Sequence, residues 1–351
     1  MTSKLHAAKA RDLIYDWNVQ GRASAYPSGV ELDDETLRDG LQSPSVLNPP
    51  VEQKIELLRL MDALGIHTAD IGYAGSSART QQDIVALAQA SLKLNIKVNV
   101  ACRTTLADIG PAVECAQKAG CQIEVSAFLG CSPIRRYAED WDFEKMMGQV
   151  EESVTFVVRH GLPCMFVTED TTRADPESMR LLYSKAIECG AAHVCVSDTV
   201  GHATPDGAYN VVSFVKGIVG ESGAAVTVDW HGHQDRGLGV ANTLAAIAAG
   251  AGRVHGCALG IGERCGNTPM DTLLVNLKLL GIIEHDLTRL PEYVRLASAM
   301  TGIALPVNYP VVGADAYRTA TGVHASAVVK ALAKNDLWLA NRVYSGVPAD
   351  W

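Results

Sequence analysis

The chain is poor in charge and contains no long apolar run. Charged residues make up 20% of its 351 residues, and the formal net charge is −9. We therefore expect neither a nucleic acid nor an anionic membrane as a partner, because both attract basic proteins. No apolar run approaches the roughly 18 residues of a transmembrane helix, and the amino terminus lacks the apolar core of a signal peptide. The hydrophobic content of 48% instead indicates a compact protein with a large core.

The cysteines lack the spacing that a zinc or redox site needs. They number nine, an odd count, and no two form a C-x-x-C pair. Several lie inside apolar runs, where a free thiol packs as a small hydrophobic group. These features predict a reduced, cytoplasmic chain without a disulfide framework. Cys265, which lies in a glycine-rich loop, is the best candidate if the protein uses a cysteine nucleophile.

Short apolar runs alternate with stretches of helical spacing along the chain. The β-branched runs predict strands at residues 30–32, 69–73, 98–102, 123–128, 165–168, 193–197, 226–230 and 253–258. The stretches that follow them predict helices at residues 51–64, 81–94, 106–118, 143–160, 176–189, 205–219, 240–249 and 270–280. Eight such units predict a (β/α)8 TIM barrel. A doubly wound sheet is the alternative, but no G-x-G-x-x-G follows the first strand.

Polar and ionisable residues gather where the predicted strands end, which is where barrel enzymes have their active sites. In chain order these residues are Arg38, Asp39, Tyr73, Arg103, Ser126, Glu169, Asp170, Asp198, Thr199, His231, His233, Glu263 and Asn267. The turns at the opposite end of the predicted barrel carry few such groups. The asymmetry predicts an enzyme with a polar pocket.

Two histidines stand at the end of the seventh predicted strand. His231 and His233 are two residues apart, so their side chains point to the same side of the strand. Convergent imidazoles at a strand end provide two of the ligands that a divalent metal needs. The alternative is a pair of polar residues that cap the strand.

Three motifs resemble those of a known family. Residues 37–42 (LRDGLQ), 231–237 (HGHQDRG) and 260–268 (GIGERCGNT) are similar to L-R-[DE]-G-x-Q, H-x-H-[DN]-D-x-G and G-x-G-E-R-x-G-N-T. They occur in that order in the metal-dependent barrel superfamily of 2-isopropylmalate synthase, homocitrate synthase and hydroxymethylglutaryl-CoA lyase. The resemblance covers roughly residues 29–345.

The resemblance implies a metal site and a substrate site. Asp39, His231, His233 and Asn267 would bind one Mg, Mn or Zn ion, which would chelate a 2-oxo acid. Arg38 would polarise the ketone, although a salt bridge at the barrel mouth is an alternative role that can coexist with this one. Thr199 resembles the family threonine that hydrogen-bonds the substrate carboxylate, and Gln42 would support the first loop.

The Glu263-Arg264 form of the third motif resembles the condensing synthases more than the lyase, whose loop carries a cysteine of the G-C-P-Y kind. It implies acyl transfer from an acyl-CoA such as acetyl-CoA, followed by thioester hydrolysis. The lyase reaction remains an alternative, as does a barrel that only binds a small ligand.

Residues 321–330 resemble a segment that follows the barrel of the synthases and reaches the partner subunit's active site. The resemblance implies a homodimer with shared active sites, in which His324 is an acid–base candidate; a histidine on a helix surface is the alternative. Glu169 matches a family active-site glutamate and is the other candidate for proton transfer.

Substrate choice is predicted from two positions before that glutamate. Homocitrate synthases have an arginine and a serine where this chain has Met165 and Val167. Neither of these side chains can pair with the second carboxylate of 2-oxoglutarate, so this substrate is disfavoured. A 2-oxo acid with an apolar tail, such as 2-oxoisovalerate, fits better. Oxaloacetate, pyruvate and specialised analogues stay open, with Arg103, Arg135 and Arg136 as candidates to bind another anion.

We therefore expect three segments: an extension at residues 1–28, a catalytic barrel at 29–285 and a helical subdomain at 286–351. The chain ends at Trp351, before the regulatory domain of a full 2-isopropylmalate synthase. We accordingly expect no feedback inhibition by an amino acid.

Overall fold

The computed structural model describes residues 14, 18, 26, 27 and 29–350. The predicted extension at residues 1–28 therefore lies almost entirely outside the described residues. The chain divides into two compact units, of which one is Pro27–Ile303 and the other includes Ala304 onward. Among the described residues, no helix has the length and apolar character needed to cross a membrane.

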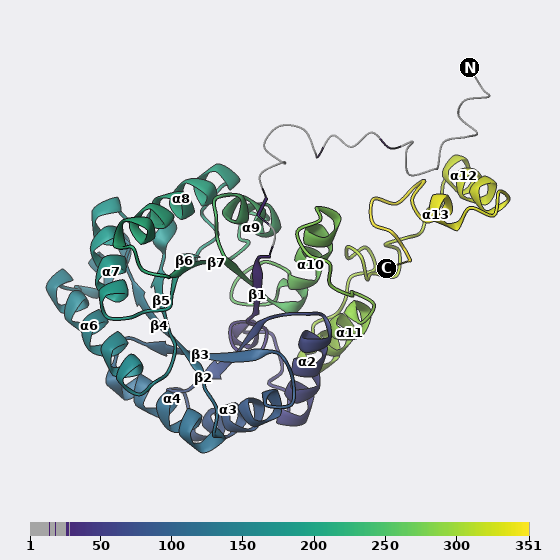
Figure 1. The fold of residues 1–351 in the computed structure, drawn as a ribbon. Coiled ribbons are helices and arrows are strands. Elements are labelled where there is room, and N and C mark those ends of the chain that lie inside the picture. The colour runs from purple at the N-terminus through teal and green to yellow at the C-terminus, as the bar shows by residue number, and fades with distance from the viewer. Residues whose placement is uncertain (1–13, 15–17, 19–25, 28, 351) are drawn as a thin grey trace. The chain divides into compact units, whose positions relative to one another are not determined.

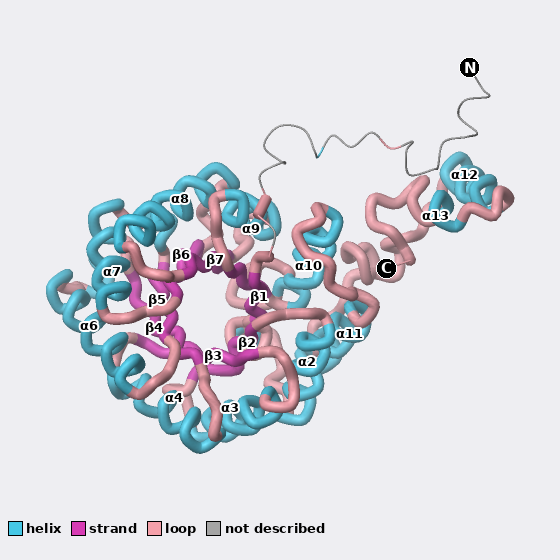
Figure 2. Tube along the Cα trace, viewed as in Figure 1, coloured by secondary structure: helices cyan, strands magenta, loops and turns pink. Residues whose placement is uncertain are grey.

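The first unit is a closed barrel of eight parallel strands in sequential order, so the predicted TIM barrel is confirmed (Figures 1 and 2). Strand β1 closes the barrel by pairing with β2 on one side and β8 on the other. The strands are β1 Glu31–Asp34, β2 Thr68–Tyr73, β3 Lys97–Arg103, β4 Glu124–Gly130, β5 Cys164–Glu169, β6 His193–Asp198, β7 Thr227–Gly232 and β8 Arg253–Gly256. Each strand begins and ends within two residues of its predicted bounds.

Helices surround the strands on the outside (Figure 2). The eight predicted helices are present as α2 Val51–Ala63, α3 Ala78–Ser91, α4 Leu106–Ala119, α6 Phe143–Arg159, α7 Pro176–Glu188, α8 Pro205–Ser222, α9 Gly239–Ala248 and α10 Met270–Leu279. A further helix, α5 Pro133–Glu139, lies after β4 and was not predicted. Short 3₁₀ turns are η4 Gly40–Gln42, η5 Thr171–Arg173 and η6 Ala258–Gly260.

Local sequence signals explain where these helices begin and end. Asp175 accepts a hydrogen bond from the backbone N–H of Ser178 at 2.9 Å, and Pro176 occupies the first position of α7. Thr204 caps α8 in the same way, through the N–H of Gly207 at 3.2 Å. Gly120 ends α4 in the left-handed conformation with φ 71°.

Helix α11, Leu290–Thr301, belongs to the same compact unit as the barrel. It packs against α2, and the hydroxyl of its fully buried Tyr293 donates a hydrogen bond to Asp34 on β1. This unit extends to Ile303, beyond the predicted barrel boundary at residue 285, because α11 packs on α2 and η6 and bonds to β1 through Tyr293.

The C-terminal unit contains α12, Gly322–Leu332, and the short α13, Leu337–Ala340, which pack against each other. The ring of His324 on α12 stacks on Tyr344, with ring centroids 4.1 Å apart. Val323 and Val329 on the same helix are 72% and 62% exposed. Exposed apolar side chains of this kind are suited to contact with another protein surface.

Candidate active site

A cavity of about 540 Å³ opens at the carboxyl ends of the barrel strands. Nine of the residues predicted for the site line it: Arg38, Asp39, Gln42, Met165, Val167, Glu169, Thr199, His231 and His233. Nine others complete the wall: Glu35, Tyr73, Ala101, Ser126, Phe128, Cys195, Ser197, His255 and Glu263. Most of the polar strand ends found in the sequence therefore converge on one space, although Arg103, Asp170, Asp198 and Asn267 do not line it.

Asn267 reaches this site through a tight glycine loop. A Cβ atom on Gly266, which has φ 90°, would lie 1.8 Å from the carbonyl oxygen of Gly260. A Cβ atom on Gly262 would lie 2.4 Å from Nδ2 of Asn267. Only glycine fits at these two positions, and the compact loop brings the Asn267 amide to Asp39, where Nδ2 donates to Oδ1 at 3.2 Å.

The candidate metal ligands lie close together. Ligand atoms of Asp39, His231 and His233 are all within 4.8 Å of one another, and all three residues are buried. The Nε2 atoms of His231 and His233 lie 3.6 and 3.8 Å from Oδ2 of Asp39. These atoms face a common point from the loop after β1 and the end of β7.

The protonation of these groups favours a metal. Burial and the neighbouring His231 lower the pKa of His233 to about 4, so this imidazole is neutral near pH 7. Burial opposes ionisation of Asp39, but Arg38, His231 and His233 together outweigh it and hold the pKa of that carboxyl below its usual value. Nδ1 of His231 lies 2.7 Å from a carboxylate oxygen of Glu35, which leaves Nε2 as the free atom of this ring.

One orphaned polar atom tests whether a divalent ion fits. Asn267 uses Nδ2 to donate to Asp39 and to the carbonyl oxygen of Ile261. Its Oδ1 is buried and has no hydrogen-bond partner in the described structure. Buried polar atoms are rarely left unpaired, and an amide oxygen is a good ligand for a hard cation. One carboxylate, two imidazoles and this oxygen therefore fit a divalent ion.

Arg38 is surrounded by three carboxylates. Its Nε donates to Asp70 at 2.6 Å, its Nη1 donates to Asp39 at 3.0 Å, and its Nη2 lies 3.2 Å from Glu35. Its side chain is still 17% exposed, and it lines the cavity. The salt-bridge role considered for this residue is therefore present, together with a place in the cavity wall.

Glu169 lies at the end of β5 and has fewer polar contacts than Arg38. Oε2 is 3.7 Å from Nε of Arg135, and the side chain is 29% exposed. Burial raises the pKa of Glu169, while Arg135 lowers it by a smaller amount. A carboxyl group with a raised pKa at the edge of a cavity is suited to proton transfer.

Of the other predicted residues, some line the cavity and Arg103 does not. Met165 and Val167 point into the cavity from β5, and the Thr199 hydroxyl oxygen accepts the backbone N–H of Asp170 at 2.8 Å. Arg103 is 62% exposed and pairs with Asp108 through two nitrogens at 2.7 and 2.9 Å. It does not line the cavity, so its role in substrate binding stays a prediction.

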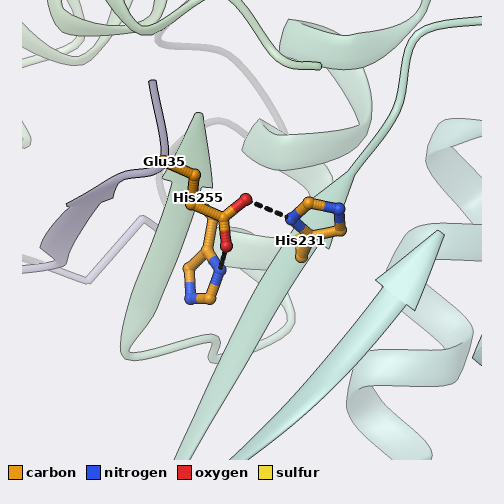
Figure 3. Close-up of side chains that lie close together, drawn as sticks. All are labelled: Glu35, His231 and His255. Carbon is orange, nitrogen blue, oxygen red and sulfur yellow. Dashed lines mark hydrogen bonds and ion pairs between the residues drawn. The ribbon is translucent and has the colours of Figure 1, made fainter. Parts of the chain in front are cut away.

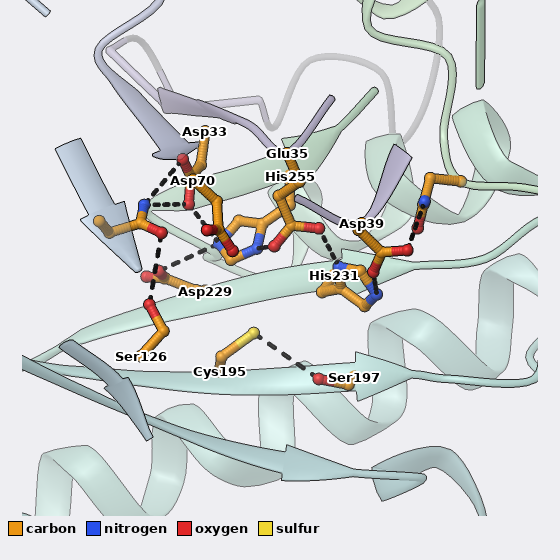
Figure 4. Close-up of polar contacts among 12 residues, drawn as sticks. Asp33, Glu35, Asp39, Asp70, Ser126, Cys195, Ser197, Asp229, His231 and His255 are labelled. Atoms are coloured by element: carbon orange, nitrogen blue, oxygen red, sulfur yellow. Dashed lines mark hydrogen bonds and ion pairs between the residues drawn. The ribbon is translucent and has the colours of Figure 1, made fainter. Parts of the chain in front are cut away.

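Two site residues were missed in the sequence. Glu35 and His255 line the cavity floor and belong to a chain of polar contacts across the barrel interior (Figure 4). Each lies two residues beyond another ionisable residue, Glu35 after Asp33 of β1 and His255 after Arg253 of β8. This period-two pattern of charge on the first and eighth strands was the signal that could have identified them.

The sequence of this chain is similar to those of known proteins. The model of the HMGL-like family matches residues 29–297. The chain belongs to the HMGL-like family. It is 35% identical over 307 residues to a "probable 2-isopropylmalate synthase" of Methanopyrus kandleri, which covers 87% of this chain and 59% of that protein. It is 32% identical to the 2-isopropylmalate synthase of Methanocaldococcus jannaschii, covering 86% of this chain and 57% of that protein.

A homocitrate synthase of Methanothermobacter thermautotrophicus is 30% identical to this HMGL-like chain over 87% of the chain and 75% of its own length. The fold is also that of a hydroxymethylglutaryl-CoA lyase of Bacillus subtilis, with a TM-score of 0.66 and 18% identity over 80% of this chain and 96% of that one. The chain spans less than two thirds of the length of the two 2-isopropylmalate synthases.

Proposed function

We propose that this protein condenses an acyl-CoA, acetyl-CoA in the first instance, with a 2-oxo acid and then hydrolyses the thioester. Acetyl-CoA, the 2-oxo acid and water would give an alkylmalate-type product and free coenzyme A. The observation that carries the proposal is the cluster of Asp39, His231 and His233 beside Arg38 in the cavity at the barrel mouth. The kinship with proteins named 2-isopropylmalate and homocitrate synthases supports the same reaction class.

Asp39, His231, His233 and Asn267 would hold the divalent ion, for which Mg, Mn and Zn are all candidates. When bound, the ion supplies Lewis-acid polarisation of the ketone of a chelated 2-oxo acid. Arg38 has five N–H groups, and its three carboxylate partners occupy three of them. The remaining two are free to donate to the oxygen on which negative charge develops.

The remaining groups would orient the substrate and move protons. Because the Thr199 oxygen accepts the N–H of Asp170, its own hydroxyl hydrogen is free to donate to the substrate carboxylate. Gln42, at the end of η4, lines the same cavity and would support the first loop. Glu169 and His324 of the partner subunit would together transfer the proton that leaves the acyl methyl group.

The cavity wall favours a 2-oxo acid with an apolar tail. Met165, Val167, Ala101 and Phe128 supply apolar surface. Among the described cavity-lining residues, Arg38 is the one arginine or lysine, and it already faces three carboxylates. A second substrate carboxylate would lack a partner, which disfavours 2-oxoglutarate. We therefore propose 2-oxoisovalerate as the preferred partner of acetyl-CoA, giving 2-isopropylmalate; citramalate- and homocitrate-type products are the alternatives.

The test is thiol release from acetyl-CoA in the presence of a divalent ion and a panel of 2-oxo acids. We expect turnover with 2-oxoisovalerate, weaker turnover with pyruvate, and little with 2-oxoglutarate or oxaloacetate. Release of acetyl-CoA from hydroxymethylglutaryl-CoA, measured in parallel, would favour the lyase alternative. Bound metal without turnover of any substrate would contradict the proposed reaction and favour a binding role.

The proposed homodimer has a separate test. We expect a subunit with His324→Ala and a subunit with Asp39→Ala each to be inactive, and their heterodimer to regain partial activity. One of its two sites would then carry both intact groups, as shared sites require. Differently tagged subunits, purified over both tags, provide the heterodimer. His160→Ala, on an exposed helix end outside the cavity, is the matched histidine control and should retain activity. An inactive heterodimer would mean that His324 acts in the active site of its own subunit or has no part in catalysis.

We further propose the cytoplasm as the location of the protein. All nine cysteines are free thiols, and eight of them are buried or half-buried in the barrel unit, at positions 102, 115, 121, 131, 164, 189, 195 and 257. Free thiols on this scale are typical of a reducing compartment.

A further inference from the structure

The Glu35 carboxylate bridges two buried histidines in the floor of the cavity (Figure 3). Oε2 lies 2.7 Å from Nδ1 of His231, and Oε1 lies 2.9 Å from Nδ1 of His255. Glu35 follows the end of β1, while the histidines lie on β7 and β8. Each carboxylate oxygen therefore serves one imidazole, and each imidazole presents the same ring nitrogen.

The contact with Glu35 determines which nitrogen of His231 carries the proton. The 2.7 Å approach of Oε2 to Nδ1 is an ion-pair contact, and because an ionised carboxylate can only accept, this contact favours the proton on Nδ1. Nε2 then presents its lone pair on the opposite side of the ring, toward Asp39 at 3.6 Å. This is the arrangement that a metal ligand needs. The Nδ1 atom of His233, in contrast, is buried with no hydrogen-bond partner in the described structure.

Glu35 is itself held in place through His255. Nε2 of His255 lies 3.2 Å from Oδ2 of Asp229, which also accepts a hydrogen bond from Nε of Arg253 at 2.6 Å. The other oxygen of Asp229 lies 2.9 Å from Nδ1 of His193. Asp229 and Arg253 are at most 2% exposed, and all of these groups are on barrel strands. The orientation of Glu35 is thus fixed by the rigid interior of the barrel.

The same three residues are close enough to be considered as a second metal site. Their contacts argue against it. Both imidazole–carboxylate pairs are at hydrogen-bond distance, 2.7 and 2.9 Å, and the remaining nitrogen of His255 faces Asp229. An ion between them would have to displace the ion pair of Glu35 with His231 and the hydrogen bond of Glu35 with His255.

We infer that Glu35 is a positioning residue that fixes the tautomer and ring orientation of His231, and that His255, anchored on Asp229, fixes Glu35. The inference rests on the proposed function, because it takes His231 as a metal ligand. It gives the two histidine ligands different support: His231 is oriented by a carboxylate, and His233 has no such partner among the described residues. Loss of the Glu35 charge should therefore weaken metal binding through His231.

The test compares Glu35→Gln with the intact protein. A glutamine has one acceptor oxygen, so it can accept from one of the two imidazoles and must turn its NH₂ group toward the other. We expect the Kd for Mn²⁺, followed by the EPR signal of the free ion, to rise about 10- to 100-fold, the usual effect of losing such a partner. His255→Gln should raise it by a smaller factor, because Glu35 remains but loses its anchor.

Asp34→Asn is the matched control. Asp34 is adjacent in sequence and fully buried, but it lies on the outer face of β1, where Tyr293 and the N–H of Thr36 contact it. We expect this variant to bind Mn²⁺ with unchanged affinity, even if its thermal stability falls. An equal loss of Mn²⁺ affinity in both variants would mean that any buried charge change near β1 loosens the site, and would overturn the inference.

A second measurement does not depend on metal or on turnover. Long-range ¹⁵N–¹H NMR of the metal-free protein in alkaline buffer reports the tautomer of each histidine, with His231→Gln to assign the signals. We expect the His231 proton on Nδ1 in the intact protein and a loss of that preference in Glu35→Gln. A proton on Nε2 in the intact protein would overturn the inference, whether or not the variants fold. Failure of the intact protein to bind Mn²⁺ or Zn²⁺ would instead count against the proposed function, and the tautomer would still decide the inference.

Discussion

Replacing His231 and His233 together with alanine is expected to remove the bound divalent ion and to abolish condensation. The two rings supply two of the four candidate ligands, and their Nε2 atoms approach the same Asp39 oxygen. Asp39 and Asn267 alone leave a site with too few protein ligands to compete with water. A Lewis-acid ion contributes several kcal/mol to catalysis, so we expect turnover to fall on the order of 10³-fold or more.

Metal content, measured by elemental analysis after dialysis, should fall in parallel with activity. His160→Ala, at an exposed helix end, is the control and should keep both. The double variant should remain folded by circular dichroism, because the hydrophobic packing between strands and helices is unchanged, although Glu35 loses a buried partner. Full metal content or full activity in the folded double variant would show that the ligands lie elsewhere.

The fold was predictable because each barrel unit repeats a simple pattern. Buried β-branched runs and amphipathic stretches alternate from Glu31 to Leu279, and the capping residues lie where the helices begin. Helix α5 was missed because it is only seven residues long, with no buried residue and hence no apolar periodicity. The extent of the barrel unit to Ile303 was not predictable either, since the contact of Tyr293 with Asp34 joins residues far apart in sequence.

The site was predictable where side chains follow strand ends, and less so inside the barrel. Arg38, Asp39, Glu169, Thr199, His231 and His233 were expected at one mouth, and all of them line the cavity. Glu35 and His255 were not expected, because the contact between them joins the first and the eighth strand and forms only when the barrel closes. Arg103, also at a strand end, pairs with Asp108 of the next helix and does not line the cavity, and its role in substrate binding stays a prediction.

Arg38→Lys is expected to reduce turnover about 100-fold or more while changing 2-oxo acid affinity much less. The guanidinium contacts Asp70, Asp39 and Glu35 and still has two N–H groups free. A lysine ammonium keeps the charge but has three hydrogens, and the three carboxylates can take all of them. No donor then remains for the oxygen that becomes negatively charged, and loss of one such donor typically costs about 10²- to 10³-fold.

Metal affinity must be measured in the same variant, because Arg38 also holds the pKa of Asp39 below its usual value. Lysine retains the positive charge, so we expect Asp39 to stay ionised and Mn²⁺ to bind with nearly unchanged affinity. Arg180→Lys, which alters an exposed arginine paired with Glu221, is the matched control and should leave kcat and KM unchanged. A rise in KM for the 2-oxo acid with normal kcat would make Arg38 a binding residue. A fall in kcat that disappears at saturating metal would assign its effect to Asp39.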